Sequence, residues 1–256
     1  MELKKNLNYQ NYCDVYDKLA KYIDLLYPHK ECSSLSGIPD RLEESFRNNK
    51  EIRIIDLCCG TGRGLHIFKE NKKFKLYGVD CSEKMLERAK QNIPNGNFEK
   101  CLLPDEDIPF KEKFHCAILV SATIQEFAPN DREKIYKKVW DLLYNGGYFI
   151  CDVLSPEKEE YYALVKKVIK KDNETSIFIY YRESLSKEKA RQHVFLIKKQ
   201  PGKDWSLQHF VLEHFVLDIA GLSEELTRAG FSKLKIWPRD SGLIIARKYI
   251  QDLFIK

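Results

Sequence analysis

The chain has 256 residues, which is long enough to bury a full hydrophobic core in one large domain. No stretch reaches the roughly 18 consecutive apolar residues that a membrane-spanning helix needs, which argues against an integral membrane protein. The first ten residues, MELKKNLNYQ, lack the apolar centre of a secretion signal, so we expect a cytoplasmic protein. The formal net charge is +5, from 43 Lys and Arg against 38 Asp and Glu.

The N-terminal region predicts two helices. Apolar and aromatic side chains recur at helical spacing through residues 9–28, and a shorter helix is expected over residues 39–48. The first helix carries a face of tyrosines, namely Tyr9, Tyr12, Tyr16 and Tyr22. Aromatic rings attract cations, so this face either forms a lid over a cationic ligand or packs on a sheet, and both alternatives are open.

An apolar run that ends in an acid then passes directly into a glycine-rich turn. The run IRIIDLCCGTGRG spans residues 52–64, and its glycines at every second position are Gly60, Gly62 and Gly64. Such a run is typical of a buried parallel strand, and glycines past its end let backbone amides approach a ligand. A second strand signal over 74–79 is followed by Asp80, where a carboxylate accepts hydrogen bonds from a ribose diol. The two strands together predict a nucleotide-type cofactor site.

The spacing of the acid and the glycines distinguishes two kinds of cofactor. A dinucleotide site carries G-x-G-x-x-G, whereas here an acid precedes G-x-G-x-G. Residues 56–64 and the run GVDCSEKML (78–86) resemble the class I S-adenosylmethionine-dependent methyltransferase family. The resemblance implies S-adenosyl-L-methionine as the cofactor, with the glycine loop beside its methionine part and Asp80 on its ribose hydroxyls. The cofactor contacts that it implies are Asp56, Cys58, Gly60, Thr61, Gly62, Asp80, Cys81, Met85, Leu102, Leu103 and Val120.

The resemblance extends through most of the chain in the expected order. Residues 114–127 look like the family's fourth strand and its loop, and residues 142–153 look like the Gly-Gly turn and the fifth strand. Residues 229–237 and 242–248 look like the closing antiparallel pair. The implied fold is α/β and Rossmann-like: a doubly wound, mostly parallel seven-stranded sheet with an antiparallel β insertion and an N-terminal helical lid.

Hydrophobic periodicity and turn residues give the order of the elements. In the core, the expected strands are 52–57, 74–79, 97–102, 115–121 and 147–153, and the expected helices are 63–70, 82–92 and 130–144. After Pro156, a helix to about Lys171 is expected to lead into three β-rich runs, 175–183, 192–199 and 207–217, before a last helix over 221–229.

These elements predict a single methyltransferase domain that covers residues 1–256. Its expected parts are an N-terminal helical lid (1–50), a cofactor-binding core (51–155), a helix plus antiparallel insertion that walls the substrate pocket (156–217), and a closing helix and strands (218–256).

The chain departs from the family pattern at two positions. Where relatives place an acid that reaches the adenine amine, the run CLLPDEDIPF has Pro104, so either Asp105 replaces the acid or Leu102 and Leu103 contact the adenine. Cys58 stands where many relatives carry glycine, and cysteine is small enough to be tolerated there.

Methyl transfer from a sulfonium is an in-line displacement that needs positioning and a dry pocket more than an obligatory base. Side chains after the fourth strand face the ligand crevice of such a sheet, so Glu126 is a candidate for orienting or deprotonating an amine, or it only caps the next helix. The other catalytic candidates are Gln125, Tyr16 and His209. Arg41 and Arg63 are candidate partners for the cofactor's carboxylate.

The eight cysteines do not indicate a metal or a disulfide framework. No C-x-x-C pair exists, and several cysteines fall in expected buried strands, so we expect reduced core thiols and no metal. Residues 156–200 hold 11 basic and seven acidic residues. This segment either binds a polyanion such as RNA or forms solvated surfaces, and the balancing acids favour the second alternative.

We therefore expect an enzyme that methylates an N or O atom of a small molecule with S-adenosyl-L-methionine. One alternative is an RNA or protein methyltransferase that uses the basic segment 156–200, and another is a cofactor-binding regulator without turnover. The sequence does not specify the acceptor or the oligomeric state.

Overall fold

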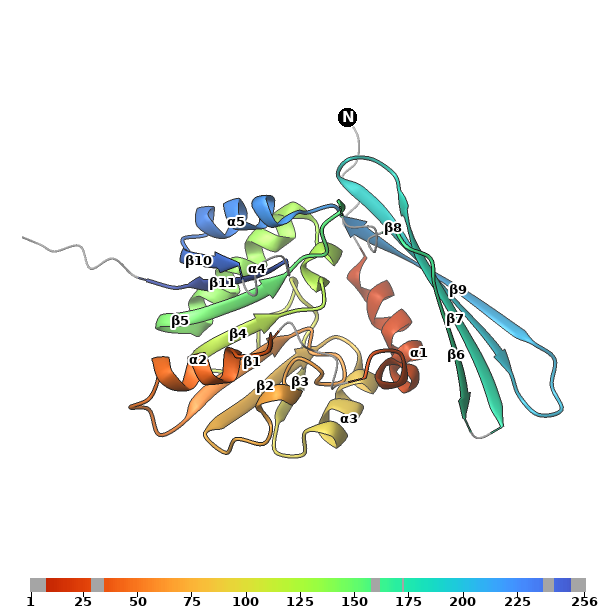
Figure 1. Cartoon of the computed structure of the whole chain (residues 1–256), viewed down its shortest axis with the longest axis horizontal. Coiled ribbons are helices and arrows are strands. Elements are labelled where there is room, and N and C mark those ends of the chain that lie inside the picture. Colours follow the sequence, from red (N-terminus) through yellow and green to blue (C-terminus); the bar gives the residue numbers. More distant parts are fainter. Residues whose placement is uncertain (1–7, 29–34, 158–161, 172, 237–241, 250–256) are drawn as a thin grey trace, which may run out of the picture.

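The computed structural model describes residues 8–28, 35–157, 162–171, 173–236 and 242–249. It contains two β-sheets, and helix α1 (Tyr9–Leu26) lies between them (Figure 1). None of the helices in this described part of the chain combines the length and the apolar character that a membrane crossing requires.

The larger sheet has seven strands in the order β10-β11-β5-β4-β1-β2-β3. Its strands are β1 (Ile52–Leu57), β2 (Phe74–Asp80), β3 (Asn97–Lys100), β4 (Phe114–Leu119), β5 (Leu143–Asp152), β10 (Ser232–Ile236) and β11 (Leu243–Arg247). The first five run parallel, whereas β11 pairs antiparallel with both β5 and β10. The predicted fold class, a mostly parallel seven-stranded Rossmann-like sheet, is confirmed.

Helices cover both faces of this sheet because its strands are apolar on both sides. In β1, Ile52 and Ile54 pack into one core cluster, and Ile55 and Leu57 pack into the other. The first cluster includes α2 (Ile38–Ser45) and α3 (Glu83–Asn92), and the second includes α4 (Pro129–Leu142) and α5 (Ile219–Arg228). Side chains that alternate between two buried faces explain why the strands read as continuous hydrophobic runs.

Local capping fixes where these helices begin. The Ser82 side chain accepts a hydrogen bond from the Met85 amide at the start of α3, and Asp218 accepts one from the Gly221 amide at the start of α5. Helix α4 begins with Pro129, a residue suited to the first helical turn. These three helices lie within a few residues of the predicted 82–92, 130–144 and 221–229.

The predicted helix over 63–70 is wrong. Only a short 3₁₀ turn, η3 (His66–Phe68), forms there, with i→i+3 bonds such as Leu65 N to Gly62 O at 3.1 Å. Gly64 in this stretch disfavours helix, as does Gly62 just before it, and Leu65 and Phe68 are buried by the turn instead.

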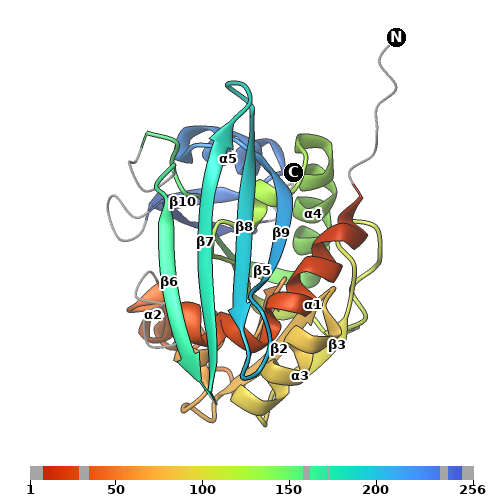
Figure 2. The ribbon, with the colours of Figure 1, turned by 90° about the vertical axis from the view of Figure 1, so that its right-hand side faces the viewer.

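The second sheet is antiparallel and has four strands, β6 (Val165–Lys171), β7 (Glu174–Ser184), β8 (Lys189–Lys199) and β9 (Ser206–Phe215), in that order. Figure 2 shows this sheet face on, with α1 behind it. The three predicted β-rich runs are confirmed, but the predicted helix before them is wrong where the structure describes it. Residues 165–171 pair with β7 throughout, for example Val168 with Ile177. The sequence of β6, VKKVIKK, contains four lysines, which suits an edge strand, since charged edges are common in sheets.

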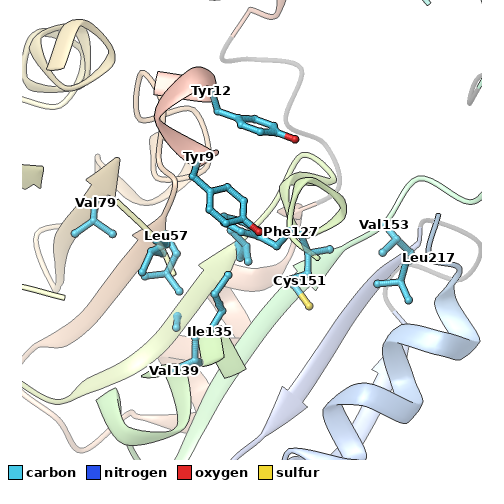
Figure 3. Close-up of a cluster of buried hydrophobic side chains, with 14 of the residues drawn as sticks. Tyr9, Tyr12, Leu57, Val79, Phe127, Ile135, Val139, Cys151, Val153 and Leu217 are labelled. Carbon is cyan, nitrogen blue, oxygen red and sulfur yellow. The ribbon is translucent and has the colours of Figure 1, made fainter. Parts of the chain in front are cut away.

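Helix α1 is fastened to the seven-stranded sheet along its length. Asp17 accepts hydrogen bonds from the Ser82 hydroxyl at 2.5 Å and the Lys84 amide at 3.3 Å. About two turns later, Asp24 pairs with Arg88 of α3 at 2.8 Å. Tyr9 points toward the segment before α4 (Figure 3), where its ring lies 5.3 Å from that of Phe127. The helix therefore holds a fixed position over the carboxyl ends of the strands.

Candidate functional site

A cavity of about 720 Å³ lies between the carboxyl ends of the parallel strands, helix α1 and the inner face of the second sheet. Its volume is in the range of about 300–1,000 Å³ that is usual for small-molecule sites. The carboxyl edge of an open α/β sheet is also where ligands bind in such folds. Three of the predicted tyrosines, Tyr9, Tyr12 and Tyr16, line the cavity. The fourth, Tyr22, instead donates a hydrogen bond to Glu174 and packs on the second sheet.

Asp80 lies at the end of β2 on the cavity wall. Its Oδ2 accepts a hydrogen bond from the Gly60 amide at 2.8 Å, and its Oδ1 accepts one from the Ser82 amide at 2.9 Å. Burial raises the pKa of this carboxyl to about 6, although the two backbone amides oppose the rise. Asp80 therefore ties the glycine loop to β2, in the position where the resemblance implies a ribose contact.

The three glycines after β1 have different surroundings. At Gly64 an added Cβ would lie 2.6 Å from Oδ2 of Asp56 and 3.1 Å from Val120, so only glycine fits this cavity wall. At Gly60 a Cβ would meet no atom within 4 Å. Gly62 does not line the cavity, because it faces Ile93, 3.0 Å from a Cβ built there. Of the glycines in this turn, Gly62, a predicted cofactor contact, therefore lies off the cavity wall, and Gly64 lies on it.

Replacing Gly62 with valine is expected to lower the stability of the protein rather than block the cavity. The backbone at this position has φ +84°, and the new side chain would press on Ile93, which together cost about 1–3 kcal/mol. Thermal unfolding should therefore shift downward by several degrees, at about 2–4 °C per kcal/mol. Gly202→Val is the matched control, since its φ is +69° with no atom within 4 Å. An unchanged melting temperature with lost S-adenosylhomocysteine binding would contradict this placement.

Two polar side chains of the loop point to a ligand. The Oγ1 of Thr61 and the Nε of Arg63 are buried without a hydrogen-bond partner in the part of the chain that the structure describes, and both residues line the cavity. Asp56 is buried beneath them, and desolvation raises its pKa well above the ordinary value. Of the two arginines predicted for the cofactor's carboxylate, Arg63 lines the cavity and Arg41 does not.

The apolar part of the predicted cofactor set also faces the cavity. Its members there are Cys58, Cys81, Met85, Leu102, Leu103 and Val120. Asp105 is exposed and lies outside the cavity wall, which favours the alternative in which Leu102 and Leu103 contact the adenine. Cys58 has φ +57°, a left-handed conformation that glycine adopts without strain. This conformation accounts for glycine in relatives at that position.

Glu126 closes η4 (Thr123–Glu126) and lines the cavity, within electrostatic range of Asp80 and Cys58. Its Oε1 accepts a hydrogen bond from the Tyr16 hydroxyl at 2.5 Å. Burial raises the pKa of Glu126 to about 7, while the Tyr16 hydrogen bond and the charge of Arg182 lower it. The carboxyl therefore titrates near neutral pH inside the cavity.

His214 of β9 lies on the opposite wall, with its Nε2 4.0 Å from Oε1 of Glu126. Its side chain is 3% exposed, and neither ring nitrogen has a hydrogen-bond partner among the described residues. Desolvation lowers its pKa to about 3, so the ring is neutral. The gap to Glu126 is too long for a direct hydrogen bond.

Two of the predicted catalytic candidates are not part of the cavity wall. Gln125 is fully buried, where its amide bonds the backbone of Leu154 and the carbonyl of Leu217, which is a structural role. His209 is exposed on the outer face of the second sheet, stacked on Phe195 at 4.2 Å. We therefore remove both from the catalytic candidates and retain Glu126 and Tyr16.

The cavity wall also contains polar residues outside the predicted site, among them Asp152, Arg182 and His214. Alternation along β9 puts His209 and His214 on opposite faces of the strand, but alternation alone does not indicate which face is internal. Asp152, at the end of β5, accepts a hydrogen bond from the Ala122 amide at 2.6 Å. Its position after a buried strand was the available signal for it.

The residues at the loop end of the cavity fit S-adenosyl-L-methionine. Asp80 offers acceptors for two hydroxyls, Arg63 and Thr61 offer donors, and Gly64 leaves space that any Cβ would fill. Apolar side chains such as Met85 and Leu103 provide surface for the adenine ring. When bound, this molecule supplies an electrophilic methyl group on a sulfonium.

Comparison with known proteins agrees with this site. Residues 54–147 match the family model described as a methyltransferase domain. An uncharacterised methyltransferase of Synechocystis sp. is 32% identical over 97 residues, which are 38% of this chain and 44% of that protein. A carboxy-S-adenosyl-L-methionine synthase of Nautilia profundicola is 26% identical over 188 residues, 72% of this chain and 71% of that protein. The chain thus spans less than half of the first relative's length.

The fold as a whole resembles solved methyltransferase structures. The sugar N-methyltransferase KedS8 from Streptoalloteichus sp. superimposes with a TM-score of 0.76 at 14% identity, covering 98% of this chain and 97% of that one. The likeness extends beyond the 94 matched residues of the family model to the second sheet. Residues 54–147 are thus a methyltransferase domain by their family match, and the strand order of the whole chain is that of the Rossmann-like fold of solved methyltransferases.

Proposed function

We propose that the protein transfers a methyl group from S-adenosyl-L-methionine to an N or O atom of a small molecule. The observation that carries the proposal is the continuity of the cavity. It reaches from the glycine loop and Asp80 to the inner face of the second sheet, where Phe178, Leu212 and His214 lie. One compartment therefore has room for a donor at one end and an acceptor at the other.

The walls of the cavity favour a small acceptor over a macromolecule. Helix α1 covers it on one side and the second sheet covers it on another, and the lining near the sheet is mostly aromatic and aliphatic. The basic segment 156–200, on which the RNA or protein alternative depends, contributes inner-face side chains such as Tyr180 and Val194 to this wall. The solved neighbour KedS8, a sugar N-methyltransferase, supports an acceptor of this size.

The same geometry supports the proposed division of the chain. Residues 1–50 supply the lid through α1, residues 51–155 supply the cofactor end, and residues 156–217 supply the acceptor wall. Residues 218–256 close the seven-stranded sheet through β10 and β11. Within this division the donor and acceptor ends come from different segments.

The proposal is tested by calorimetry followed by transfer assays. S-adenosylmethionine and S-adenosylhomocysteine are expected to bind with micromolar or tighter affinity, and NAD, the control, is not. Radiolabelled methyl groups should then pass to low-molecular-weight fractions of a metabolite extract, and mass spectrometry should show one added methyl group. Binding without transfer to any acceptor pool would favour the non-catalytic regulator, and label in RNA or protein would favour the macromolecular alternative.

A further inference from the structure

The cavity wall holds an acid and an imidazole, Glu126 and His214, that make no hydrogen bond to each other. The carboxylate of Glu126 is 12% exposed and the ring of His214 is 3% exposed, and 4.0 Å separates them. An imidazole buried without a hydrogen-bond partner costs free energy, so a native protein keeps one where a ligand or water completes it. Both side chains border the cavity, which makes an acceptor the natural partner.

We infer, on the basis of the proposed function, that the methyl acceptor is an amine whose ammonium proton passes to Glu126, while His214 hydrogen-bonds the acceptor from the opposite wall. A carboxylate in an apolar cavity is best neutralised by a cation, and an ammonium group both pairs with it and donates hydrogen bonds. The neutral ring of His214 offers one donor and one acceptor, which suits a polar substituent beside the amine.

Acidity favours nitrogen over a hydroxyl oxygen at this site. A primary ammonium loses its proton near pH 10.4, as in lysine, whereas an aliphatic hydroxyl resembles water at about 15.7. Burial raises the pKa of Glu126 to about 7. The equilibrium constant for moving a proton to its carboxylate is therefore unfavourable by a factor on the order of 10³ for the amine and 10⁹ for the aliphatic hydroxyl. Only the first is small enough for one carboxylate to overcome without further help.

The reaction balances with the groups present. The N–H bond of the ammonium breaks and its proton moves to the Glu126 carboxylate, which frees the nitrogen lone pair. That pair forms a bond to the donor's methyl carbon as the carbon–sulfur bond breaks and its electrons stay on sulfur. The products are S-adenosylhomocysteine and a protonated N-methylamine, and Glu126 releases its proton to solvent.

The electrostatics of Glu126 depend on groups from five other parts of the fold. The charged and titratable groups around it are Tyr12 and Tyr16 of α1, Cys58 after β1, Asp80 of β2, Arg182 of β7 and His214 of β9. Of these, the Tyr16 hydroxyl stabilises the ionised carboxylate by direct donation at 2.5 Å. Tyr16 is thus a positioning residue for Glu126.

The test uses acceptor pairs that differ only in the nucleophile: 2-phenylethylamine with 2-phenylethanol, and glucosamine with glucose. The wild-type protein should methylate the amine of a pair and not the alcohol, with kcat rising through an inflection near pH 7. In Glu126→Gln, kcat should fall by about 10²–10⁴ and the inflection should vanish, while S-adenosylhomocysteine affinity stays unchanged. Tyr16→Phe should move the inflection to higher pH, because the carboxylate loses its donor.

His214→Asn should raise KM for the amine by about tenfold, as expected for one buried hydrogen bond. His209→Asn, on the outer face of the same strand, is its matched control and should match wild type. Methylation of the alcohols, or a Glu126→Gln variant with wild-type rate and pH dependence, overturns the inference and leaves the proposed function standing. Absence of transfer to every acceptor pool contradicts both. Calorimetry of the amine with the S-adenosylhomocysteine-loaded variants gives a second readout that does not depend on turnover.

Discussion

Replacing Asp80 with alanine is expected to weaken S-adenosylhomocysteine binding by at least about 100-fold. The carboxylate lies at the end of β2 on the cavity wall, where the family resemblance implies bonds to two ribose hydroxyls. A hydrogen bond to a charged acceptor contributes about 1.5–3 kcal/mol, and each 1.4 kcal/mol is tenfold in affinity. The loss of two such bonds therefore dominates any other single change at this end of the cavity.

Calorimetric titration of the purified variant measures the effect. Asp80 also accepts hydrogen bonds from the Gly60 and Ser82 amides, so the melting temperature must be recorded to separate lost contacts from a disturbed loop. Asp80→Asn is the closer substitution, since it keeps one acceptor oxygen. Glu99→Ala, on the exposed surface of the neighbouring strand β3, is the control and should bind normally. Unchanged affinity in Asp80→Ala would show that the ribose is held elsewhere.

Replacing Arg132 with alanine is expected to destabilise the fold by about 3–5 kcal/mol. Arg132 of α4 makes a two-pronged ion pair with Glu225 of α5, at 2.8 and 2.5 Å, and its side chain is 4% exposed. Its third nitrogen donates to the carbonyl of Phe127, next to Glu126 in the chain. Removing the arginine leaves a buried carboxylate with only the Tyr136 hydroxyl as a donor among the described side chains.

Denaturant unfolding measures the free energy of unfolding that Arg132→Ala loses. A double variant shows whether the unpaired charge causes this loss. Arg132→Met combined with Glu225→Met removes both charges, so it should recover much of the stability lost in the single variant. A double variant that is no more stable than Arg132→Ala would mean that packing, and not the unpaired charge, sets the cost. Arg132 holds the carbonyl of Phe127, and both Phe127 and Glu126 line the cavity. The single variant should therefore also raise KM for the acceptor, because this part of the wall loses its support.

The cofactor half of the site was predictable because it is built from two local segments. Asp56, Gly60 and Asp80 follow two adjacent parallel strands, and a continuous hydrophobic run followed by glycine or acid identifies such strands without knowledge of the rest of the fold. The closing antiparallel pair was expected from the family resemblance, and β10 and β11 form it. Even here, the tertiary structure determines which glycine lines the cavity. The space for a Cβ at Gly62 depends on Ile93, and the space at Gly64 depends on Asp56.

The two wrong helices show where local patterns fail. Residues 63–70 carry helical spacing, but the turn after β1 must stay beneath the cavity floor, where 3₁₀ bonds form instead. Residues 165–171, VKKVIKK, place apolar residues at a spacing that a helix allows and that an edge strand also tolerates. Pairing with β7 decides for the strand, because seven consecutive residues find partners there. Tertiary pairing overrides propensity in both segments.

The sequence by itself determined the fold family, the cofactor and the identity of Glu126 and Tyr16 as candidates, since each depends on residues close to a recognisable strand end or helix face. The tertiary structure decided the acceptor end. Tyr16, Glu126 and His214 come from α1, η4 and β9, which are far apart in the chain and meet only when the second sheet folds over α1. A period of two separates the faces of a strand, but only packing against the rest of the protein determines which face is buried.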